Sequence, residues 1–331
     1  MILRGSEWPT VYNSSGARGF YGEGYWFHDL WNRFGLDYSG AGFVSKTTTI
    51  DPRPGNMPIE SRTWRPMERV PRCIVVKPYE GVVLNSVGLS GPGAQKVLAM
   101  LRHVHNVFTA PKIMVSFMAI EEKLAGRMKE LQRFVDLFGE LLENRPIGSI
   151  ALQINVSCPN VEHGGQDAVK SSRVLLQSLE NQGRGRLPNV PALVKLNALV
   201  DPFLAADISR HDRCDGIIAS NTIPWGQLPD EIPWKKLFGS DTSPLAHLGG
   251  GGLSGKPLLP IVGRWIREAR LAGLKKPIIA GGGILSQKDA QFLLECGADA
   301  IELGSVAILR PWRVQGIIKF VNEYTQSRHQ T

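Results

Sequence analysis

The stretch Pro277-Ile-Ile-Ala-Gly-Gly-Gly-Ile284, with its continuation to Ala300-Ile-Glu-Leu-Gly-Ser305, decides the fold of this 331-residue chain. Each end of it is a short, apolar, β-branched run that stops at glycine, as a buried β-strand does. The residues between, near 286–296, have the length and apolar spacing of a helix. This order is typical of two parallel strands joined by a crossover helix. The stretch therefore predicts an α/β protein.

The same alternation of strand and helix continues through the rest of the sequence. Eight such units fit a (β/α)8 TIM barrel, a fold that takes about 250 residues before insertions, so we expect one domain over residues 1–331. The predicted strands are 10–13, 42–46, 112–116, 151–157, 192–196, 216–221, 277–281 and 300–304. The predicted helices lie near 23–37, 91–108, 121–144, 167–183, 201–211, 257–273, 286–296 and 311–326.

Two segments do not fit the alternation. Residues 47–90 contain six prolines before a ninth strand-like run at 82–88, so no helix is expected to connect that run to the barrel. Residues 223–256 end in a glycine cluster. We expect both segments to be excursions over the C-terminal face of the barrel.

The composition is that of an ordinary globular protein, with 43% hydrophobic and 21% charged residues. The chain has no run of about 18 apolar residues and does not begin with a basic segment followed by an apolar one. A soluble cytoplasmic protein with no membrane span is therefore expected. The formal net charge is +8, but Lys and Arg are scattered, which favours a basic pocket for a small anion over a nucleic-acid surface.

The four cysteines lie far apart and form no Cys-x-x-Cys pair, so no metal site or disulfide is expected within this chain. Cys158 differs from the others because it directly follows the fourth predicted strand, at the start of a loop. A thiolate there could act as a base or a nucleophile. Cys73, Cys214 and Cys296 are expected to be small buried hydrophobic residues.

Glycine and polar residues stand where the predicted strands end. The carboxyl ends of barrel strands meet at one face, so these residues would converge on a single site. Barrels commonly bind phosphate through glycine turns after their last two strands, which here are 281–283 and 304–305. A third cluster, Gly249–Gly255, precedes a predicted helix and could add N–H donors. Any one cluster is equally well explained as a tight turn, but three together favour a phosphate-bearing cofactor.

Lysine and asparagine side chains give the predicted site its polar character. Lys46 and Lys195 close apolar strands, where an unpaired charge is costly, so each is expected to meet an anion at the open end; a lysine can also extend from a strand end into solvent. A single Asn more often caps a turn. Four at one face favour a flat, amide-rich ring as the ligand: Asn85, Asn155, Asn160 and Asn221.

With Asn155-Val-Ser-Cys-Pro-Asn160 in place, the sequence resembles the catalytic subunit of dihydroorotate dehydrogenase over almost its whole length. The other segments that carry the resemblance follow in family order. They are Lys46-Thr-Thr-Thr, Asn85-Ser-Val-Gly-Leu89, Val194-Lys-Leu196, Ser220-Asn-Thr222, Gly251-Gly-Leu-Ser-Gly-Lys256, Gly281-Gly-Gly-Ile284 and Leu303-Gly-Ser305.

The resemblance implies a barrel that binds FMN and a dihydroorotate ring. It places a cofactor-binding set at Ser14, Ser15, Gly16, Lys46, Asn155, Lys195, Gly252, Gly282, Gly283, Gly304 and Ser305, with Lys195 at the pyrimidine edge of the flavin. It places a substrate-binding set at Lys46, Asn85, Gly88, Leu89, Asn155, Asn160, Asn221 and Thr222.

The implied reaction oxidises dihydroorotate to orotate in de novo pyrimidine synthesis. Cys158 would take a proton from the ring carbon beside the carbonyl while the neighbouring carbon gives a hydride to FMN; Lys195 is the second expected catalytic residue. A cysteine base is the mark of the family's soluble class 1 enzymes. The run 159–165 resembles the type that works with a separate iron–sulfur and FAD subunit, and a homo-oligomer is expected.

Two other functions remain open from the sequence. A related dihydropyrimidine dehydrogenase domain reduces uracil or thymine, and its site need not recognise a ring carboxylate. A flavin-binding partner protein would have no turnover of its own, and its biological effect would survive the replacement of Cys158.

Overall fold

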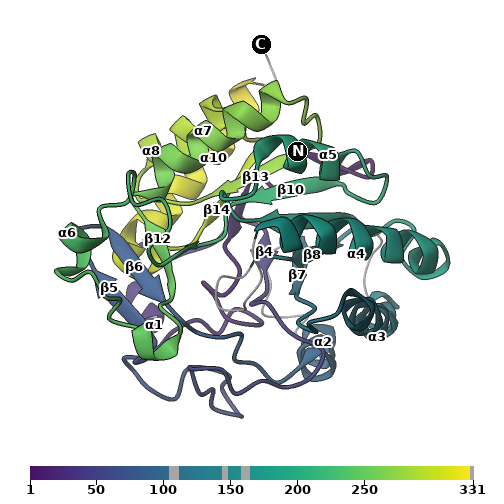
Figure 1. Cartoon of the computed structure of the whole chain (residues 1–331), viewed down its shortest axis with the longest axis horizontal. Coiled ribbons are helices and arrows are strands. Elements are labelled where there is room, and N and C mark those ends of the chain that lie inside the picture. The colour runs from purple at the N-terminus through teal and green to yellow at the C-terminus, as the bar shows by residue number, and fades with distance from the viewer. Residues whose placement is uncertain (104–111, 144–147, 158–164, 329–331) are drawn as a thin grey trace.

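The computed structural model describes residues 1–103, 112–143, 148–157 and 165–328. Its centre is an eight-stranded parallel sheet in which neighbours in sequence are also neighbours in space. The predicted (β/α)8 barrel is therefore confirmed (Figure 1). In sheet order the strands are β3 (Val11–Asn13), β14 (Ala300–Leu303), β13 (Ile278–Gly281), β10 (Gly216–Ala219), β9 (Ala192–Leu196), β8 (Ile150–Asn155), β7 (Ile113–Phe117) and β4 (Phe43–Val44).

The barrel closes between β3 and β4 with the help of one side chain. A parallel bridge between Tyr12 and Gly42 joins the two short strands. Beyond it, the Asn13 amide takes the place of a backbone pair: its Nδ2 donates to the Val44 carbonyl at 2.7 Å and its Oδ1 accepts from the Val44 N–H at 3.2 Å. Because an amide carries both a donor and an acceptor, Asn13 continues the ladder across the seam.

Helices cover the outside of the barrel, and most lie where the apolar spacing predicted them. On the amphipathic helix α7, for example, Ile261, Trp265 and Ala269 recur at helical spacing and are buried. The barrel helices are α2 (Ala94–His103), α3 (Leu124–Leu142), α4 (Gly165–Arg186), α5 (Pro202–Ser209), α7 (Leu258–Leu271), α8 (Gln287–Glu295) and α10 (Val314–Arg328).

The predicted helix near 23–37 is wrong for most of its length. Only α1, His28–Trp31, is helical there. Gly24 and Gly35 have φ of 61° and 105°, in the left-handed region, so the backbone cannot continue a right-handed helix through either of them. The first unit of the barrel therefore has a long irregular connection in place of its helix.

The barrel interior has two layers that differ in polarity. The lower layer is apolar and is sealed at the amino end by Leu3 and Trp8, from the hairpin of β1 (Ile2–Leu3) and β2 (Ser6–Glu7) and the residues after it. Two residues further along the same strands, the side chains are polar yet buried: Ser116, Gln153, Lys195 and Glu302. The lower layer contains Tyr12, Val44, Met114, Ala151, Leu193, Ile218, Ile279 and Ala300.

The two segments outside the alternation, 47–90 and 223–256, supply a second sheet beside the barrel (Figure 1). Its four strands are antiparallel, in the order β11 (Ile223–Pro224), β12 (Gly252–Gly255), β6 (Val82–Asn85) and β5 (Ile74–Lys77). The ninth strand-like run is thus β6. The glycine cluster 249–255 was expected as a turn before a helix, but its second half forms β12 and pairs with β6. The short helices are α6 (Trp234–Phe238), α9 (Val306–Leu309) and the 3-10 turns 246–248 and 311–313.

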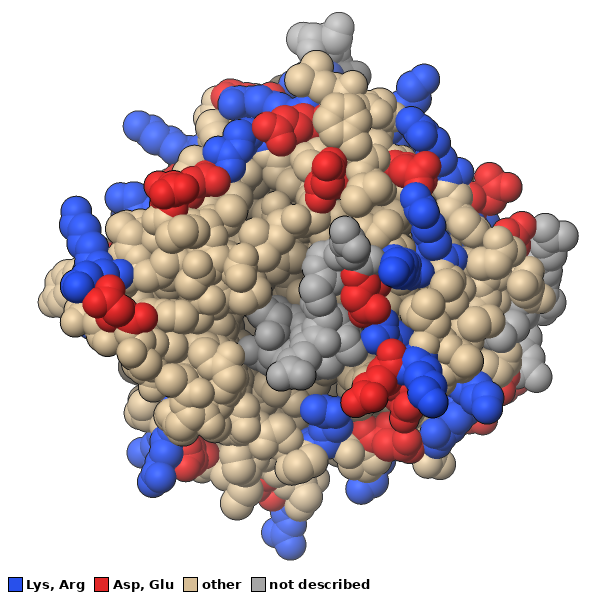
Figure 2. Space-filling model, viewed as in Figure 1, with Lys and Arg blue, Asp and Glu red and all other residues tan. Residues whose placement is uncertain are grey.

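The charged residues are mixed on the face shown in Figure 2, where Lys and Arg alternate with Asp and Glu around a large uncharged area. No continuous basic surface is visible on that face. Within the described ranges, none of the helices combines the length and the apolar character that a membrane crossing needs.

Candidate active site

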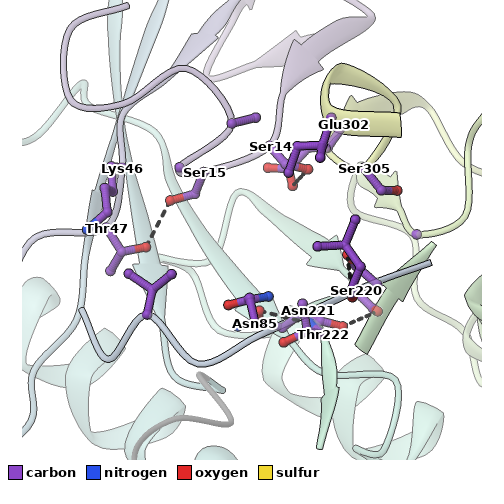
Figure 3. Close-up of a pocket in the computed structure, with 18 of the residues that line it drawn as sticks. Ser14, Ser15, Lys46, Thr47, Asn85, Ser220, Asn221, Thr222, Glu302 and Ser305 are labelled. Carbon is purple, nitrogen blue, oxygen red and sulfur yellow. Dashed lines mark hydrogen bonds between the residues drawn. The ribbon is translucent and has the colours of Figure 1, made fainter. Parts of the chain in front are cut away.

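A single cavity collects most of the residues that the sequence singled out. It lies between the carboxyl ends of the barrel strands and the second sheet, and its polar side chains point inward from several strands (Figure 3). The predicted residues that line it are Ser14, Ser15, Gly16, Lys46, Asn85, Leu89, Asn155, Lys195, Asn221, Thr222, Gly282, Gly283, Gly304 and Ser305.

Two of the described site residues, Gly88 and Gly252, are not among those lining the cavity. Gly88 lies between Val87 and Leu89, which do line it, and has a φ of 71°, so it shapes the turn that presents them. Gly252 lies in β12 beside Asn85, whose Nδ2 donates to the Gly252 carbonyl at 3.3 Å. Cys158 and Asn160 lie outside the described residues, so their predicted roles stay predictions.

A chain of hydrogen bonds fixes the amide groups on one side of the cavity. The Asn221 Nδ2 donates to the Asn155 Oδ1 at 3.2 Å, and the Asn155 Nδ2 donates to the Thr47 Oγ1 at 3.2 Å. Thr47 also bonds the Ser15 Oγ at 2.9 Å and the Ser116 Oγ at 2.8 Å. The amides are therefore already oriented before a ligand arrives, which lowers the entropy cost of binding.

The glycine turns after β13 and β14 are packed so closely against neighbouring residues that a side chain would crowd them. Gly282 and Gly283 have φ of 127° and 77°, which disfavours other residues there. A Cβ at Gly283 would lie 2.7 Å from the Leu259 backbone nitrogen, and one at Gly304 would lie 3.2 Å from the Ser14 Cβ. These turns have the open backbone that phosphate groups approach in barrels. The residues present fit a phosphate-bearing cofactor.

The floor of the cavity holds an ion pair between Lys195 and Glu302. The Lys195 Nζ donates to the Glu302 Oε2 at 2.8 Å, and the Ser14 Oγ donates to the same oxygen at 3.1 Å. In the sheet, β10 and β13 lie between β9, which carries Lys195, and β14, which carries Glu302, so the pair spans the barrel interior. The anion expected beside Lys195 is thus a carboxylate of the chain itself.

Lys46 enters the cavity from the opposite side. Its Nζ donates to the Ser90 carbonyl and lies 4.9 Å from the centre of the Phe20 ring. Both contacts favour a positive charge, since the carbonyl oxygen and the face of the ring are electron-rich. The ammonium is therefore held where a negatively charged group of a ligand in the cavity could meet it.

The remaining wall of the cavity is apolar. Tyr25, Ile74, Val83, Leu258 and Ile308 line it. Burial raises the pKa of Tyr25 to about 12, so its phenol stays neutral at ordinary pH. One cavity therefore offers a polar side with two lysines and an amide row, and an apolar side that suits a large ring system.

Sequence reasoning missed Glu302, Thr47 and Tyr25 as site residues. The signal for Glu302 was present, because a carboxylate in the middle of the apolar run Ala300–Leu303 needs a buried partner. Thr47 lies one residue beyond the predicted strand end, and Tyr25 comes from the segment wrongly predicted to be a helix. In the described part of the chain, no three His, Cys, Asp or Glu residues group closely enough to hold a metal ion.

Comparison with solved structures identifies the fold. The dihydroorotate dehydrogenase (DHODH) of Eimeria tenella, solved in complex with ferulenol, superposes with a TM-score of 0.66 at 18% identity. The match covers 97% of this chain and 84% of the Eimeria chain. At this identity the match shows the shared barrel fold alone.

Comparison with known sequences identifies the family. A putative dihydroorotate dehydrogenase A (fumarate) of Pediococcus pentosaceus is 28% identical over 290 residues, which are 85% of this chain and 83% of that protein. The catalytic subunit of dihydroorotate dehydrogenase B (NAD(+)) of Listeria monocytogenes is 28% identical over 304 residues, 90% of this chain and 84% of that protein. The dihydroorotate dehydrogenase family model matches residues 17–324. The chain is therefore an oxidoreductase that belongs to the dihydroorotate dehydrogenase family.

Proposed function

We propose that this enzyme oxidises dihydroorotate to orotate with FMN as its cofactor, in the de novo synthesis of pyrimidine nucleotides. The observation that carries the proposal is the single cavity in which an oriented amide row, two lysines and the glycine turns after β13 and β14 meet at the carboxyl ends of the barrel strands. Membership of the dihydroorotate dehydrogenase family supports the same reaction.

The cofactor would be held by residues from both ends of the chain. Gly282, Gly283, Gly304 and Ser305 would hold its phosphate, while Ser14, Ser15, Gly16 and Lys195 would contact its ring system. Bound FMN supplies a two-electron acceptor that takes up a hydride. The apolar wall would exclude water from that part of the cavity.

The substrate would lie against the amide row. Lys46 would meet the ring carboxylate, and Asn85, Asn155, Asn221 and Thr222 would match the donors and acceptors of the ring. Asn160, Gly88 and Leu89 complete the proposed set. The hydrogen bonds from Asn221 through Asn155 to Thr47 keep these amides in one orientation, so that the two reacting C–H bonds are held in a fixed direction.

Cys158 is the proposed general base. Its neighbour Ser157 is anchored in the site, since the Ser157 Oγ donates to the Lys195 carbonyl at 3.0 Å and the Ser157 N–H donates to the Asn155 Oδ1 at 3.3 Å. Cys158 directly follows Ser157 in the sequence, which supports the proposed role. Its thiolate would take the proton from the carbon beside the carbonyl as the hydride leaves the neighbouring carbon, which gives orotate.

An anaerobic titration of the FMN-loaded enzyme with dihydroorotate, followed by the visible flavin absorbance, tests the proposal. We expect bleaching in the wild type and a rate lower by orders of magnitude in Cys158→Ala. Cys296→Ala, at the end of α8, is the matched control and should bleach as the wild type does. A yellow protein that dihydroorotate does not bleach would exclude the substrate, and a protein that cannot be loaded with FMN would exclude the mechanism.

The same titration with dihydrouracil separates the rival dihydropyrimidine reaction. Dihydrouracil lacks the ring carboxylate that Lys46 is proposed to meet, so we expect no bleaching. Equal bleaching by both compounds would favour the rival. A flavin-binding protein without turnover would be bleached by neither.

We further propose that a separate iron–sulfur and FAD subunit takes up the electrons in the cytoplasm, and that the catalytic chain forms a homo-oligomer. The segment 159–165 and the catalytic subunit of the NAD-linked Listeria relative support the subunit. Reoxidation of the reduced enzyme by fumarate alone, as the name of the Pediococcus relative suggests, would contradict it. Sedimentation of the purified chain measures the oligomeric state.

A further inference from the structure

We propose that Glu302 is a positioning residue that lowers the reduction potential of the bound FMN, because its carboxylate neutralises the Lys195 ammonium inside the cavity. The inference rests on the proposed function, since it requires that FMN binds in this cavity. It concerns a residue that no part of the proposed reaction yet uses.

Glu302 holds two groups that are expected to contact the flavin. Its Oε2 accepts from the Lys195 Nζ at 2.8 Å and from the Ser14 Oγ at 3.1 Å. Lys195 comes from β9 and Ser14 follows β3, on the other side of the barrel. One carboxylate oxygen therefore fixes both groups relative to each other.

The carboxylate has little else to bind. Its Oε1 is buried and has no hydrogen-bond partner among the described residues. The side chain of Glu302 is fully buried and that of Lys195 is 6% exposed. A buried charge that loses its partner is costly, so the ammonium is expected to stay with the carboxylate when a ligand enters.

The net charge of the Lys195–Glu302 pair would affect the reduction potential of the bound flavin. A reduced flavin gains electron density, and a bare ammonium beside it would stabilise that state and raise the reduction potential. An adjacent carboxylate offsets the ammonium, and in a buried site neither charge is screened well by water or salt. Both Lys195 and Glu302 line the cavity, so the flavin would face a pair whose net charge is close to zero.

The negative charge of Glu302 already affects a second group in the barrel. The pKa of the Tyr12 phenol is raised well above its usual value, first by burial and then by the charge of Glu302. Tyr12 pairs with Glu302 in the β3–β14 register.

Four forms of the FMN-loaded enzyme test the inference by their reduction potentials, measured anaerobically against reference dyes. Glu302→Gln removes the negative charge but keeps an acceptor for Lys195. We expect it to favour the reduced cofactor about tenfold, or about 30 mV for a two-electron couple. Lys195→Met should shift the potential downward by a similar amount. The double variant restores a neutral pair and should return close to the wild-type potential.

A purely structural role for Glu302 predicts a different pattern. The potential would then be the same in Glu302→Gln and the wild type, and the double variant would match Lys195→Met; either result would overturn the inference. Glu130→Gln is the control for loss of a buried carboxylate that does not line the cavity. Glu130 accepts from the Ile120 and Glu121 N–H groups, and its replacement should leave the potential unchanged.

The reduction potentials still test the inference if Glu302→Gln does not fold. The double variant carries no unpaired charge, and its potential must then lie above that of Lys195→Met. A wrong role for Glu302 can also be told apart from a wrong proposed function. The potential is measured without dihydroorotate, so an enzyme with the expected shifts that dihydroorotate does not bleach would keep the role of Glu302 and lose the substrate. A chain that binds no FMN would overturn both.

Discussion

The two layers inside the barrel are built from the same strands but differ completely in character. On β9 the lower layer has Leu193 and the upper layer Lys195; on β14 the corresponding residues are Ala300 and Glu302. Every second side chain on a strand faces the same way. The apolar lower layer and the polar layer are therefore only two residues apart along each of these strands. The fold thus places a fully buried apolar layer directly under the polar side chains of the site.

The largest effect on stability is expected in the polar layer, not in the apolar one. Glu302→Leu removes one member of a buried ion pair and leaves Lys195 uncompensated, which costs about 3–5 kcal/mol. Denaturant unfolding of the chain measures this, and the double variant Lys195→Met with Glu302→Leu should recover most of the loss. A loss below about 1 kcal/mol in the single variant would mean that other groups balance the Lys195 charge.

The apolar lower layer is tested by Leu193→Ala. This change leaves a cavity among side chains that are completely buried and should cost about 3 kcal/mol. The FMN affinity of the folded fraction should stay the same, because Leu193 does not line the active-site cavity. Thermal unfolding together with a flavin titration gives both values. Weaker FMN binding in the folded fraction would contradict the separation of the two layers.

The glycine turn after β13 is tested by Gly283→Ala. This change should lower the free energy of unfolding by about 2 kcal/mol. The new Cβ would meet the Leu259 backbone at 2.7 Å in a residue whose φ is 77°. We expect FMN affinity to fall at least tenfold. Gly273→Ala is the matched control, since its φ is 89° but no atom lies within 4 Å of the new Cβ. Equal FMN affinity in both variants would contradict a role for Gly283 in holding the phosphate.

The smallest effect is expected from Thr47→Val, which removes a hydroxyl bonded to Ser15, Ser116 and Asn155. The stability should fall by about 1 kcal/mol. The KM for dihydroorotate should rise several-fold because Asn155 loses the partner that orients it. Thr49→Val, whose hydroxyl bonds the Asp51 carbonyl outside the cavity, should leave the KM unchanged. Steady-state kinetics decides between these outcomes.

The barrel was predictable because its strands carry a strong local signal. Runs such as Ile278–Gly281 are apolar, β-branched and ended by glycine, so their type and position follow from nearby residues alone. The segment 23–37 shows the limit of this reasoning. Its aromatic residues have roughly helical spacing, but only His28–Trp31 form a helix, and Trp31 packs against Trp312 with ring centres 5.3 Å apart. Tertiary packing and two left-handed glycines outweighed the local pattern.

The site was predictable where a residue at or near the carboxyl end of its strand carries a signal of its own. Lys195, Asn155 and Asn221 follow from the rule that carboxyl ends of barrel strands meet at one face. Glu302 lies just as near the end of its strand, but its role depends on a partner more than 100 residues away in sequence that only the closed barrel brings near. Gly252 was assigned to a turn because its pairing with Asn85 on β6 is also a long-range contact.

The closure of the barrel sets the time at which the active site can form during synthesis. β3 and β14 are partners, although nearly the whole chain separates them. At about 5–20 residues per second, roughly 15–60 s pass between the synthesis of the first strand and that of the last. Ser14 and Lys195 acquire their shared contact with Glu302 only after that interval. A ribosome that stalls before β14 therefore releases a chain with most of its helices but no place for a cofactor, and FMN can stabilise only the completed protein.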